Sequence, residues 1–473
     1  LIVSDLDPLE VYFSPMGDPP TDLFSFAAAA PAVPNVSTAA MADSAGKTSG
    51  LVLKNLSTPE QPANFFASLK LESAHAYIHS ADFNPIEIIA GGNIEELVVF
   101  SPKAANMLAG GDIRGVHYFG QHLNADDLTS IRAKGDIFVP STAQPVSSSS
   151  DPSIDTTGFI FNGPGDFLVQ AGGSIDLGIS RGIQATGNTF LSQLPLANLD
   201  QEKGTLAVIA GLFKDLAVDE IKEFFATLQE SGNSFSDLRA RGELAQAAEV
   251  AEQTQREVIE PFFSGGIRGE GDLFMTSSQI STSGKTARVQ LPFDEDRPDQ
   301  VDLYEESSDI YVITGGDANV GLTAIPDPTV TIQETDSGIF TAEGGSIDVF
   351  TGGDLNVNES RVMTFRGGNV LAYSGSGNIN AGRGSKTAIN AGSPRVENIL
   401  DDDGNVVGKR LVFEPPSVGS GIRTLTYDPD GILGPQKAPL AGDGFLFAPR
   451  GVIDAGEAGI ATRNLTVGAD RKS

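Results

Sequence analysis

A repeated glycine-containing unit constrains the fold of this chain more than any other feature. Within the stretch Gly344–Asn390, a Gly pair or Gly-x-Gly is followed by a small polar residue and then by an alternating strand pattern. Gly345 and Gly368 are 23 residues apart, and Gly353 and Gly377 are 24 residues apart. Two interleaved copies with nearly the same period predict one turn of a solenoid that contains two corners.

The same unit recurs upstream, which extends the predicted solenoid over most of the chain. It appears in Ile88–Ile94, Leu108–Ile113, Ile131–Ile137 and Gly163–Gly187. Strands on successive turns stack about 4.8 Å apart, and each repeat packs on its neighbours. The 54 Gly and the low aromatic content of 7% suit a structure with many tight corners. We therefore predict an all-β fold, a right-handed parallel β-helix with a helical insertion.

Alternation within the strands predicts which residues enter the core. Ile347, Val349 and Ile379 are expected to point inward, whereas Asp348 and Asn380 are expected to face water. The corner glycines are expected to supply left-handed backbone, which most other residues adopt poorly. Because the corners stack, Asn or Asp should lie above Asn or Asp, so that side-chain ladders can form.

The period of the apolar residues changes at residue 212, which predicts an inserted helical hairpin over 212–262. We expect a first helix over Leu212–Leu228, a break at Ser231–Asn233, and a second helix capped by Ser236 that runs to about Glu260 and is closed by Pro261. The apolar stripe of the first helix is Phe213, Leu216, Ile221, Phe224, Phe225 and Leu228. The hairpin either forms a binding face or covers one side of the rod.

Four regions follow from these patterns. Residues 1–80 are an irregular start, 81–211 a β-helix, 212–262 the hairpin, and 263–473 a second β-helical part. The last part contains an acidic loop at 294–310 and an antiparallel strand pair near 396–413. The hairpin and the loops at 27–50, 140–157 and 294–310 are the candidates for contact with other molecules.

Charge and cysteine content exclude several function classes. The net charge of −31 argues against binding to nucleic acid or to anionic lipid, because both would be repelled. Zero Cys excludes disulfides, thiol catalysis and Cys-ligated metals. A cytosolic protein and a chain exported in unfolded form both fit this absence. We find no apolar run long enough to span a bilayer.

Acidic residues recur at predicted corners, at Asp112, Asp136, Asp166, Asp354 and Asp454. Polysaccharide lyases and hydrolases built on β-helices use such carboxylates as acid and base or with Ca²⁺. A repeated corner position instead favours a structural role in hydrogen bonding. We therefore predict no catalytic residue.

The histidines are weak candidates for metal binding. His75 and His79 form a close pair, and His117 and His122 stand apart. No carboxylate motif with metal-ligand spacing accompanies any of them. We therefore expect no metal site built on histidine.

One acidic turn is the remaining candidate for a metal. Asp401, Asp402 and Asp403 are weak candidates for loosely bound Ca²⁺. The run lacks the ligand spacing of a calcium loop, and followed by Gly404 and Asn405 it is typical of a turn between two strands. We expect no tightly bound cofactor.

The run Gly375–Thr387 resembles the C-terminal region of filamentous-haemagglutinin-like exoproteins of the two-partner secretion type. Further similar runs follow in the order of that family, at Gly163–Gly187, Gly419–Leu425 and Phe445–Gly459. The resemblance covers roughly Ile88 to Val467. It implies a secreted β-helical fibre of a Gram-negative cell surface, an outer-membrane transporter barrel as a partner during export, and in many members adhesion.

Two functions from different classes remain open. The first is a non-enzymatic segment of a surface fibre in adhesion or filament and matrix assembly, with end-to-end self-association and an unknown surface or glycan receptor. The second is a polysaccharide lyase or glycosidase on a β-helical scaffold. The strand pattern at Leu465–Val467 is unfinished, which leads us to expect continued strand pairing there.

Overall fold

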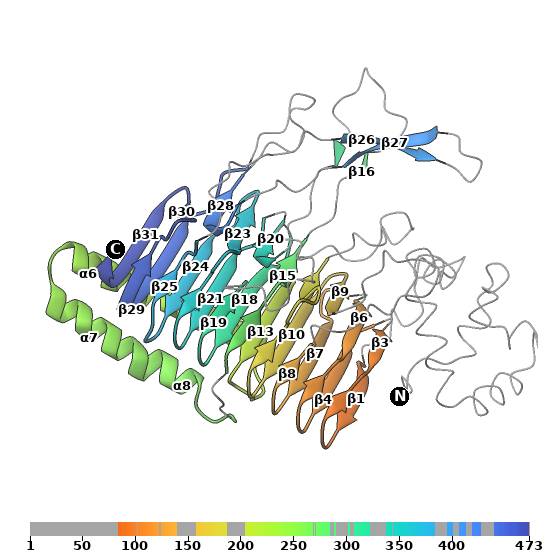
Figure 1. Cartoon of the computed structure of the whole chain (residues 1–473), viewed down its shortest axis with the longest axis horizontal. Coiled ribbons are helices and arrows are strands. Elements are labelled where there is room, and N and C mark those ends of the chain that lie inside the picture. Colours follow the sequence, from red (N-terminus) through yellow and green to blue (C-terminus); the bar gives the residue numbers. More distant parts are fainter. Residues whose placement is uncertain are drawn as a thin grey trace, which may run out of the picture.

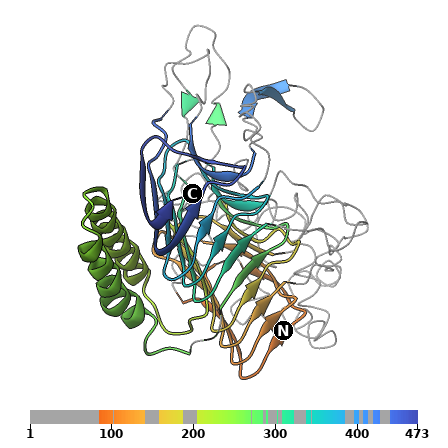
Figure 2. The same ribbon diagram turned by 60° about the vertical axis from the view of Figure 1, so that its left-hand side comes forward.

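The computed structural model shows a parallel β-helix with a helical hairpin along one side (Figures 1 and 2). The structure describes residues 84–139 except 102 and 123, 158–186, 204–283 except 268 and 270, 288–289, 301–302, 307–321, 337–383 except 343, 395–400, 406–412, 419–426 and 439–472. Each complete turn, or rung, carries three strands, and the strands stack into three faces that we name A, B and C.

Face A is the widest of the three and is parallel throughout. Among the described residues it has ten strands, which in stacking order are β1 (Ile86–Ala90), β4 (Ala105–Ala109), β7 (Leu128–Ala133), β10 (Asp166–Ala171), β13 (Thr205–Ala210), β18 (Asp309–Thr314), β21 (Ile347–Thr351), β24 (Val370–Ser374), β29 (Gly444–Asp454) and β31 (Leu465–Lys472).

Faces B and C complete each rung. Face B consists of β3 (Val98–Ser101), β6 (His117–Gln121), β9 (Phe159–Asn162), β12 (Ile183–Ala185), β15 (Gln279–Thr282), β20 (Gly338–Thr341), β23 (Arg361–Phe365), β28 (Gly421–Leu425) and β30 (Ile460–Ala461). Face C consists of the short strands β2 (Ile94–Glu95), β5 (Ile113–Arg114), β8 (Ile137–Phe138), β11 (Ile175–Asp176), β14 (Leu273–Met275), β19 (Ala318–Val320), β22 (Leu355–Asn356) and β25 (Ile379–Asn380), followed by the end of β29.

Three faces give three corners per rung, whereas the sequence predicted two. The corner between faces A and C carries the glycine pairs and was recognised from them. The corner between faces C and B was missed because different residues form it on different rungs. Glu96, Gly115, Gly178 and Asn358 all adopt positive φ there. The prediction of two corners was therefore wrong.

The core is one continuous apolar column inside the rod. Ile347, Val349 and Ile379 are fully buried, as the alternation predicted. The register places Ile310, Ile347 and Val370 above one another on face A. Stacking of like side chains carries the core from Ile86 in β1 to Ala469 in β31.

Two antiparallel strand pairs lie outside the rod. β16 (Arg288–Val289) pairs with β17 (Val301–Asp302), and β26 (Arg395–Leu400) pairs with β27 (Val406–Val412). The second pair spans residues 395–412 and corresponds to the strand pair expected near 396–413. Its turn, the irregular start at 1–80, the loop at 140–157 and most of the acidic loop at 294–310 lie outside the described residues.

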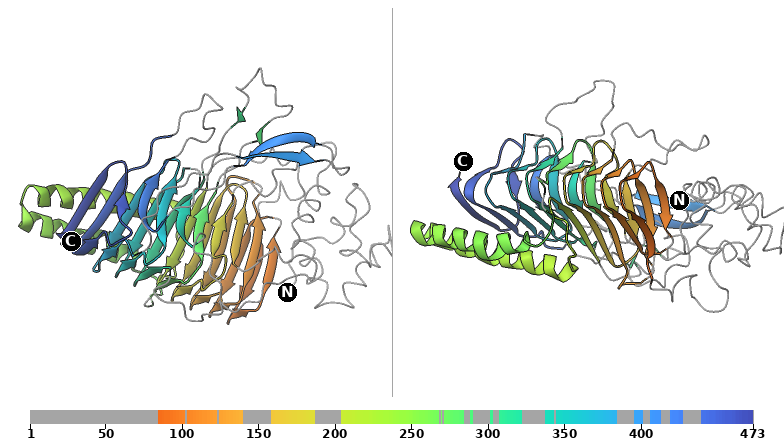
Figure 3. Two further views of the ribbon diagram at one scale, coloured as in Figure 1. Left: turned by 45° about the horizontal axis from the view of Figure 1, so that its top comes forward. Right: turned by 90° about the horizontal axis from the view of Figure 1, so that it is seen from below.

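The inserted hairpin lies along face A, and its helices run along the rod (Figure 3). Its elements are α6 (Val218–Ala240), α7 (Leu244–Thr254), a π-helical turn η3 (Gln255–Ile259) and α8 (Glu260–Phe262). The chain leaves face A near Phe213 and returns near Ile267. These two residues bond to each other in an antiparallel bridge, with N···O distances of 2.9 and 3.0 Å.

The predicted helix boundaries were wrong in four places. The first helix begins at Val218 rather than at residue 212, and it continues through Ser231–Asn233 to Ala240. The reversal occurs at residues 241–243. Ser236 does not cap a second helix, because its hydroxyl donates a hydrogen bond to the Val467 carbonyl of β31 at 2.9 Å. The helical turns continue through Pro261 to Phe262.

Gly232 remains helical because its position requires a residue without a side chain. A Cβ on Gly232 would overlap the ring of Phe447, which is fully buried in the outer surface of β29. Glycine in a helix costs about 1 kcal/mol relative to alanine. Here it allows α6 to approach face A closely, so that packing on the sheet outweighs the local preference for a break.

Candidate interaction surfaces

A row of polar side chains follows the corner between faces A and C, and we name it the AC ladder. Each member accepts a hydrogen bond from the backbone N–H at the same position one rung further on, at 2.7–3.1 Å. The accepting side chains are those of Asn93, Asp112, Asp136, Ser174, Asp272, Asp317, Asp354 and Asn378. The ladder satisfies corner N–H groups that have no strand partner.

The glycine before five of the positions along the ladder is required by space rather than by backbone conformation. At Gly111, Gly135, Gly173, Gly353 and Gly377, a Cβ would overlap the side-chain oxygen of the ladder residue on the preceding rung. None of the five has positive φ. The expectation of left-handed backbone at these glycines was therefore wrong. The Gly-Asx pattern instead arises because the ladder side chain of the preceding rung occupies the space that a Cβ on the glycine would need.

The five predicted corner aspartates do not share one corner. Asp112, Asp136 and Asp354 belong to the AC ladder, and the Asp136 N–H together with Arg114 holds the pKa of Asp112 below its usual range. Asp454 lies at the corner between faces C and B, where its carboxylate accepts from the Gly456 N–H at 2.9 Å. Asp166 opens β10, where burial raises its pKa.

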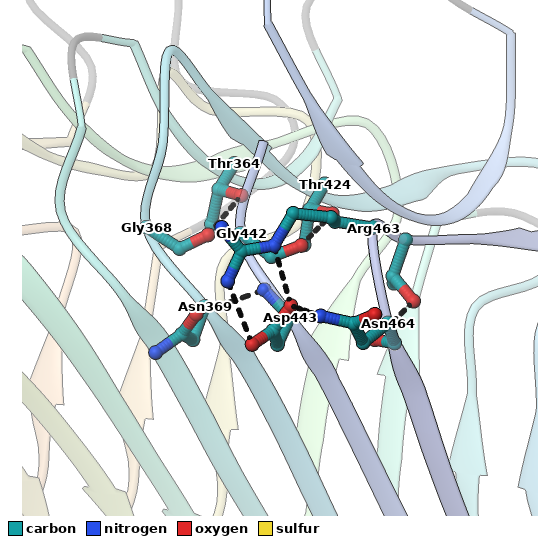
Figure 4. A network of polar contacts seen from close by, with 9 residues as sticks. Thr364, Gly368, Asn369, Thr424, Gly442, Asp443, Arg463 and Asn464 are labelled. Atoms are coloured by element: carbon teal, nitrogen blue, oxygen red, sulfur yellow. Dashed lines mark hydrogen bonds and ion pairs between the residues drawn. The ribbon is translucent and has the colours of Figure 1, made fainter. Parts of the chain in front are cut away.

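The third corner, between faces B and A, ends in an exposed polar network at the last rungs (Figure 4). Asn369 accepts from the Asp443 N–H at 2.9 Å, and Asn464 donates to Asp443 at 2.8 Å. Arg463 donates two bonds of 2.9 Å to the same carboxylate and lowers its pKa. Thr424 donates to the Gly442 carbonyl at 2.6 Å. The carboxylate is fully engaged in joining neighbouring rungs.

The two histidines in the described region are internal. The ring nitrogens of His122 lie 2.8 Å from the Pro164 carbonyl and 2.6 Å from the Thr129 hydroxyl, and its ring stacks on Phe167. Burial lowers the pKa of His122 to about 4. His117 is also buried, and its Nδ1 accepts from the Gly158 N–H at 3.1 Å. Neither side chain is presented to solvent.

The other predicted metal candidates lie outside the described residues. These are the histidine pair His75 and His79 and the three aspartates of the acidic turn, Asp401, Asp402 and Asp403. Within the described part of the chain, no three His, Asp or Glu side chains converge on a possible metal position. The described strands on either side of the acidic turn, β26 and β27, do pair with each other, as a turn at that position requires. Loose Ca²⁺ binding at Asp401, Asp402 and Asp403 stays a prediction.

A row of outward-facing residues along face A explains why the helices pack there, and we name it the outer row. Strand register aligns, in stacking order, Ile89, Leu108, Arg132, Gln170, Ile209, Ile313, Phe350, Tyr373, Phe447 and Gly468. From Ile209 to Phe447 the row is apolar and buried against Ile221, Phe224, Phe225 and Leu228 of α6. The hairpin thus seals apolar side chains that would otherwise face water.

Asp348 departs from the predicted exposure. It projects outward from β21 as expected, but it is only partly exposed beside the helical cover. Burial, reinforced by Asp309, raises the pKa of Asp348 to about 8. The prediction that Asp348 faces open water was therefore wrong, because the alternation pattern cannot report a helix packed on the outer face.

Three arginines fasten the hairpin to the rod. Arg132 on β7 binds Asp215 and the Lys214 carbonyl at 2.8 and 3.0 Å. Arg450 on β29 binds Glu252 of α7 at 2.8 Å. Arg239 of α6 bonds to the Asp470 carbonyl of β31. Sequence reasoning missed these arginines, since partners up to 231 residues apart carry no local signal.

Apolar side chains are exposed at the last described rung. In β31, Leu465 points toward the core axis, yet 46% of its surface is exposed. Figures 1 and 3 show the α6–α7 turn projecting past β31. Leu244, at the start of α7, is 56% exposed there.

Comparison with protein families bears on the same end of the rod. Residues 367–471 match the family model described as "Filamentous haemagglutinin family outer membrane protein". This span includes β24, β25 and the last strands of faces A and B. It confirms the resemblance seen in the sequence, over that region. No curated protein and no solved structure matches the chain. None of the described helices is long and apolar enough to cross a membrane.

Proposed function

We propose that this chain is a non-enzymatic structural segment of a secreted cell-surface fibre, which acts in adhesion or in the assembly of extracellular filaments or matrix. The observation that carries the proposal is the continuous rod with family sequence at its C-terminal rungs. A stack of rungs sustained by a corner ladder is suited to spanning distance and presenting loops. The net charge of −31 keeps such a rod soluble.

The proposal includes a route to the surface and a type of partner. Filamentous-haemagglutinin-like exoproteins use an outer-membrane transporter barrel, and we propose the same for this chain. The absence of Cys is compatible with passage as an unfolded chain. We also propose end-to-end self-association, because strand edges at an open rung pair readily with another chain.

The lyase or glycosidase alternative gains no support from the described residues. It requires carboxylates that converge from neighbouring rungs on a substrate. Asp112, Asp136 and Asp354 instead bond to backbone N–H groups along the AC ladder. Turnover of uronate polymers, assayed with and without calcium, would reinstate the enzymatic function.

Electron microscopy of material released by the producing cell tests the proposal, with the subunit ends located by mass spectrometry. We expect long, thin fibres that contain peptides of this chain and are missing from a strain that lacks it. The same strain should attach less to surfaces. Globular particles, or unchanged fibres and attachment in the deletion strain, would contradict a structural role.

A further inference from the structure

We propose that Asp348 makes the attachment of the hairpin to face A pH-dependent, so that the helices are held more firmly on the rod in acidic solution than in alkaline solution. Opening of the hairpin exposes the apolar side chains that it covers, and Asp348 would adjust how often this happens. The contact joins two parts of one chain, and its pH dependence is therefore independent of the fibre role proposed above.

Asp348 lies in the middle of the apolar contact between the hairpin and the sheet. Strand register places it between Tyr311 of β18 and Leu371 of β24, and Phe350 is the next outward residue of its own strand. Tyr311, Leu371 and Phe350 are buried and belong to the same cluster as Phe225 of α6. The carboxyl group is thus enclosed on three sides by side chains that the helices cover.

The nearest charge makes ionisation of this carboxyl group less favourable still. Among the described residues, the charged group that acts on Asp348 is a second carboxylate, Asp309. Asp309 is held in place by the Ser346 N–H, which donates to it at 2.7 Å two residues before Asp348. Burial and the neighbouring negative charge together raise the pKa of Asp348 to about 8. The Tyr311 hydroxyl stays protonated, because burial and the same carboxylates raise its pKa as well.

The remaining charged groups of the contact lie further along it. Asp166 opens β10, where burial raises its pKa, and Lys222 and Asp219 of α6 act on it with opposite signs. The helical segment instead places aromatic rings beside the centre of the contact, Phe224 of α6 and Phe263 directly after α8. Asp166 therefore contributes a pH dependence in the same direction, at the start of α6.

The ion pairs that join the hairpin to the rod lie at the exposed rim of the contact. Their acidic side chains, Asp215, Glu252 and Asp470, are 97%, 67% and 55% exposed. Exposed ion pairs contribute little to stability. The apolar contact around Asp348 therefore determines how often the hairpin opens.

The direction of the effect follows from the two states of the carboxyl group. When the hairpin opens, Asp348 meets water and its pKa returns to the ordinary value near 4. The closed state therefore holds a proton over a pH range in which the open state has lost it. Closure weakens as pH rises from about 4 to about 8 and is independent of this group outside that range.

Hydrogen–deuterium exchange of the full chain tests the proposal, with Asp348→Asn as the variant. Asparagine has nearly the same shape as aspartic acid and cannot ionise. The exchange rates of α6 amides are compared between the native chain and the variant at the same pH, because their ratio cancels the intrinsic pH dependence of exchange. We expect the native-to-variant ratio to rise at least about tenfold between pH 5 and pH 8, the effect of one pKa unit or more.

The matched control is Asp237→Asn, which removes an exposed carboxylate from the same helix. Its ratio to the native chain should stay near one at both pH values. Amides of β4, whose residues are not part of the cluster beneath the helices, should exchange equally in the native chain and in Asp348→Asn. A ratio for α6 that does not change with pH would overturn the inference, and so would the same change in β4 or with the control variant.

A thiol probe beneath α6 gives a second measurement that does not depend on amide exchange. The chain has no Cys, and Ala207 is buried in the same outward row of face A as Tyr311 and Asp348. Ala207→Cys is made with and without Asp348→Asn, and labelling by a small thiol reagent is timed at equal pH. We expect the same rise in the ratio of labelling rates between pH 5 and pH 8. Equal rates in the two chains at pH 8 would contradict a role of Asp348 in holding the hairpin.

Discussion

At the scale of single residues, each AC-ladder side chain and the glycine one rung further on share one space. The oxygen of Asp317 lies where a Cβ of Gly353 would be, and it accepts from the Asp354 N–H at 2.7 Å. The two positions therefore constrain each other although they are 36 residues apart in the sequence. In a sequence, a Gly-Asx dipeptide predicts a turn. In this rod it instead marks the place where two neighbouring rungs contact each other.

Replacement of Asp317 by Ala should destabilise the rod by about 1–2 kcal/mol, because it leaves the Asp354 N–H without an acceptor. Asp317→Asn is the matched control and should retain most of the stability, since its side chain keeps the accepting oxygen. Urea denaturation followed by circular dichroism measures both. Equal loss in the two variants would show that charge, rather than the hydrogen bond, stabilises the corner.

Gly353→Ala should be strongly destabilising in the native chain and much less so together with Asp317→Ala, because the second change empties the space that the new methyl group needs. A double-mutant cycle should therefore give a coupling energy of about 1 kcal/mol or more. Additive effects would mean that the two positions do not share space.

Asp348→Asn should stabilise the protein at neutral and higher pH. The folded-state pKa of Asp348 is raised to about 8, so the native chain loses stability as pH rises from the carboxyl's ordinary value near 4 to about 8. The neutral amide should remove this dependence and gain about 1–3 kcal/mol at pH 8, with little change at pH 4. Urea midpoints at both pH values measure it, and Asp454→Asn at an exposed corner is the control.

At the scale of elements, the alternating pattern was sufficient to predict the strands and their inward residues, as Ile347 and Val349 show. It was insufficient for the hairpin. A helix boundary depends on what the helix packs against, and Gly232 reads as a break until Phe447 is known to lie beneath it. The arginine attachments at Arg132 and Arg450 were likewise unpredictable, because the rungs between the partners set their distance.

Gly232→Ala should loosen the hairpin, although alanine is the better helix former. The added methyl group would overlap the buried ring of Phe447, so α6 must move away from face A. We expect faster amide hydrogen exchange in α6 and a loss of about 1–3 kcal/mol. Ser234→Ala, at an exposed position of the same helix, is the control. Higher stability of Gly232→Ala would contradict the packing described for α6.

At the scale of the whole molecule, the hairpin is a cover rather than a part of the stack. The bridge between Phe213 and Ile267 closes the path of the chain at the point where the hairpin departs. The hairpin interrupts a single rung, between β13 and β14, and both strands still pair with the rungs before and after it, β13 with β10 and β18 and β14 with β11 and β19. We therefore expect the β-helix to form without the helices, and the helices determine what its outer row contacts.

Replacement of residues 215–265 by a short glycine-containing turn should leave the β-strand signal in circular dichroism intact. The outer row from Ile209 to Phe447 would then face water, so we expect strong binding of an apolar dye and concentration-dependent aggregation. Polar replacements of Ile313 and Phe350 in the shortened chain should reduce both. Loss of the strand signal would show that the hairpin is required for the stack itself.

Along the AC ladder, the number of residues between two successive corners varies, but the spacing of those corners along the rod does not. Consecutive ladder partners are 19 residues apart at Asn93 and Asp112 but 98 apart at Ser174 and Asp272, and the hydrogen bonds are 2.9 and 3.1 Å. Any segment added between two rungs is carried outward, while the next corner returns to the same place. Proteins built this way can acquire new surface modules by insertion without lengthening or interrupting the rod, and the hairpin of this chain is one such acquisition.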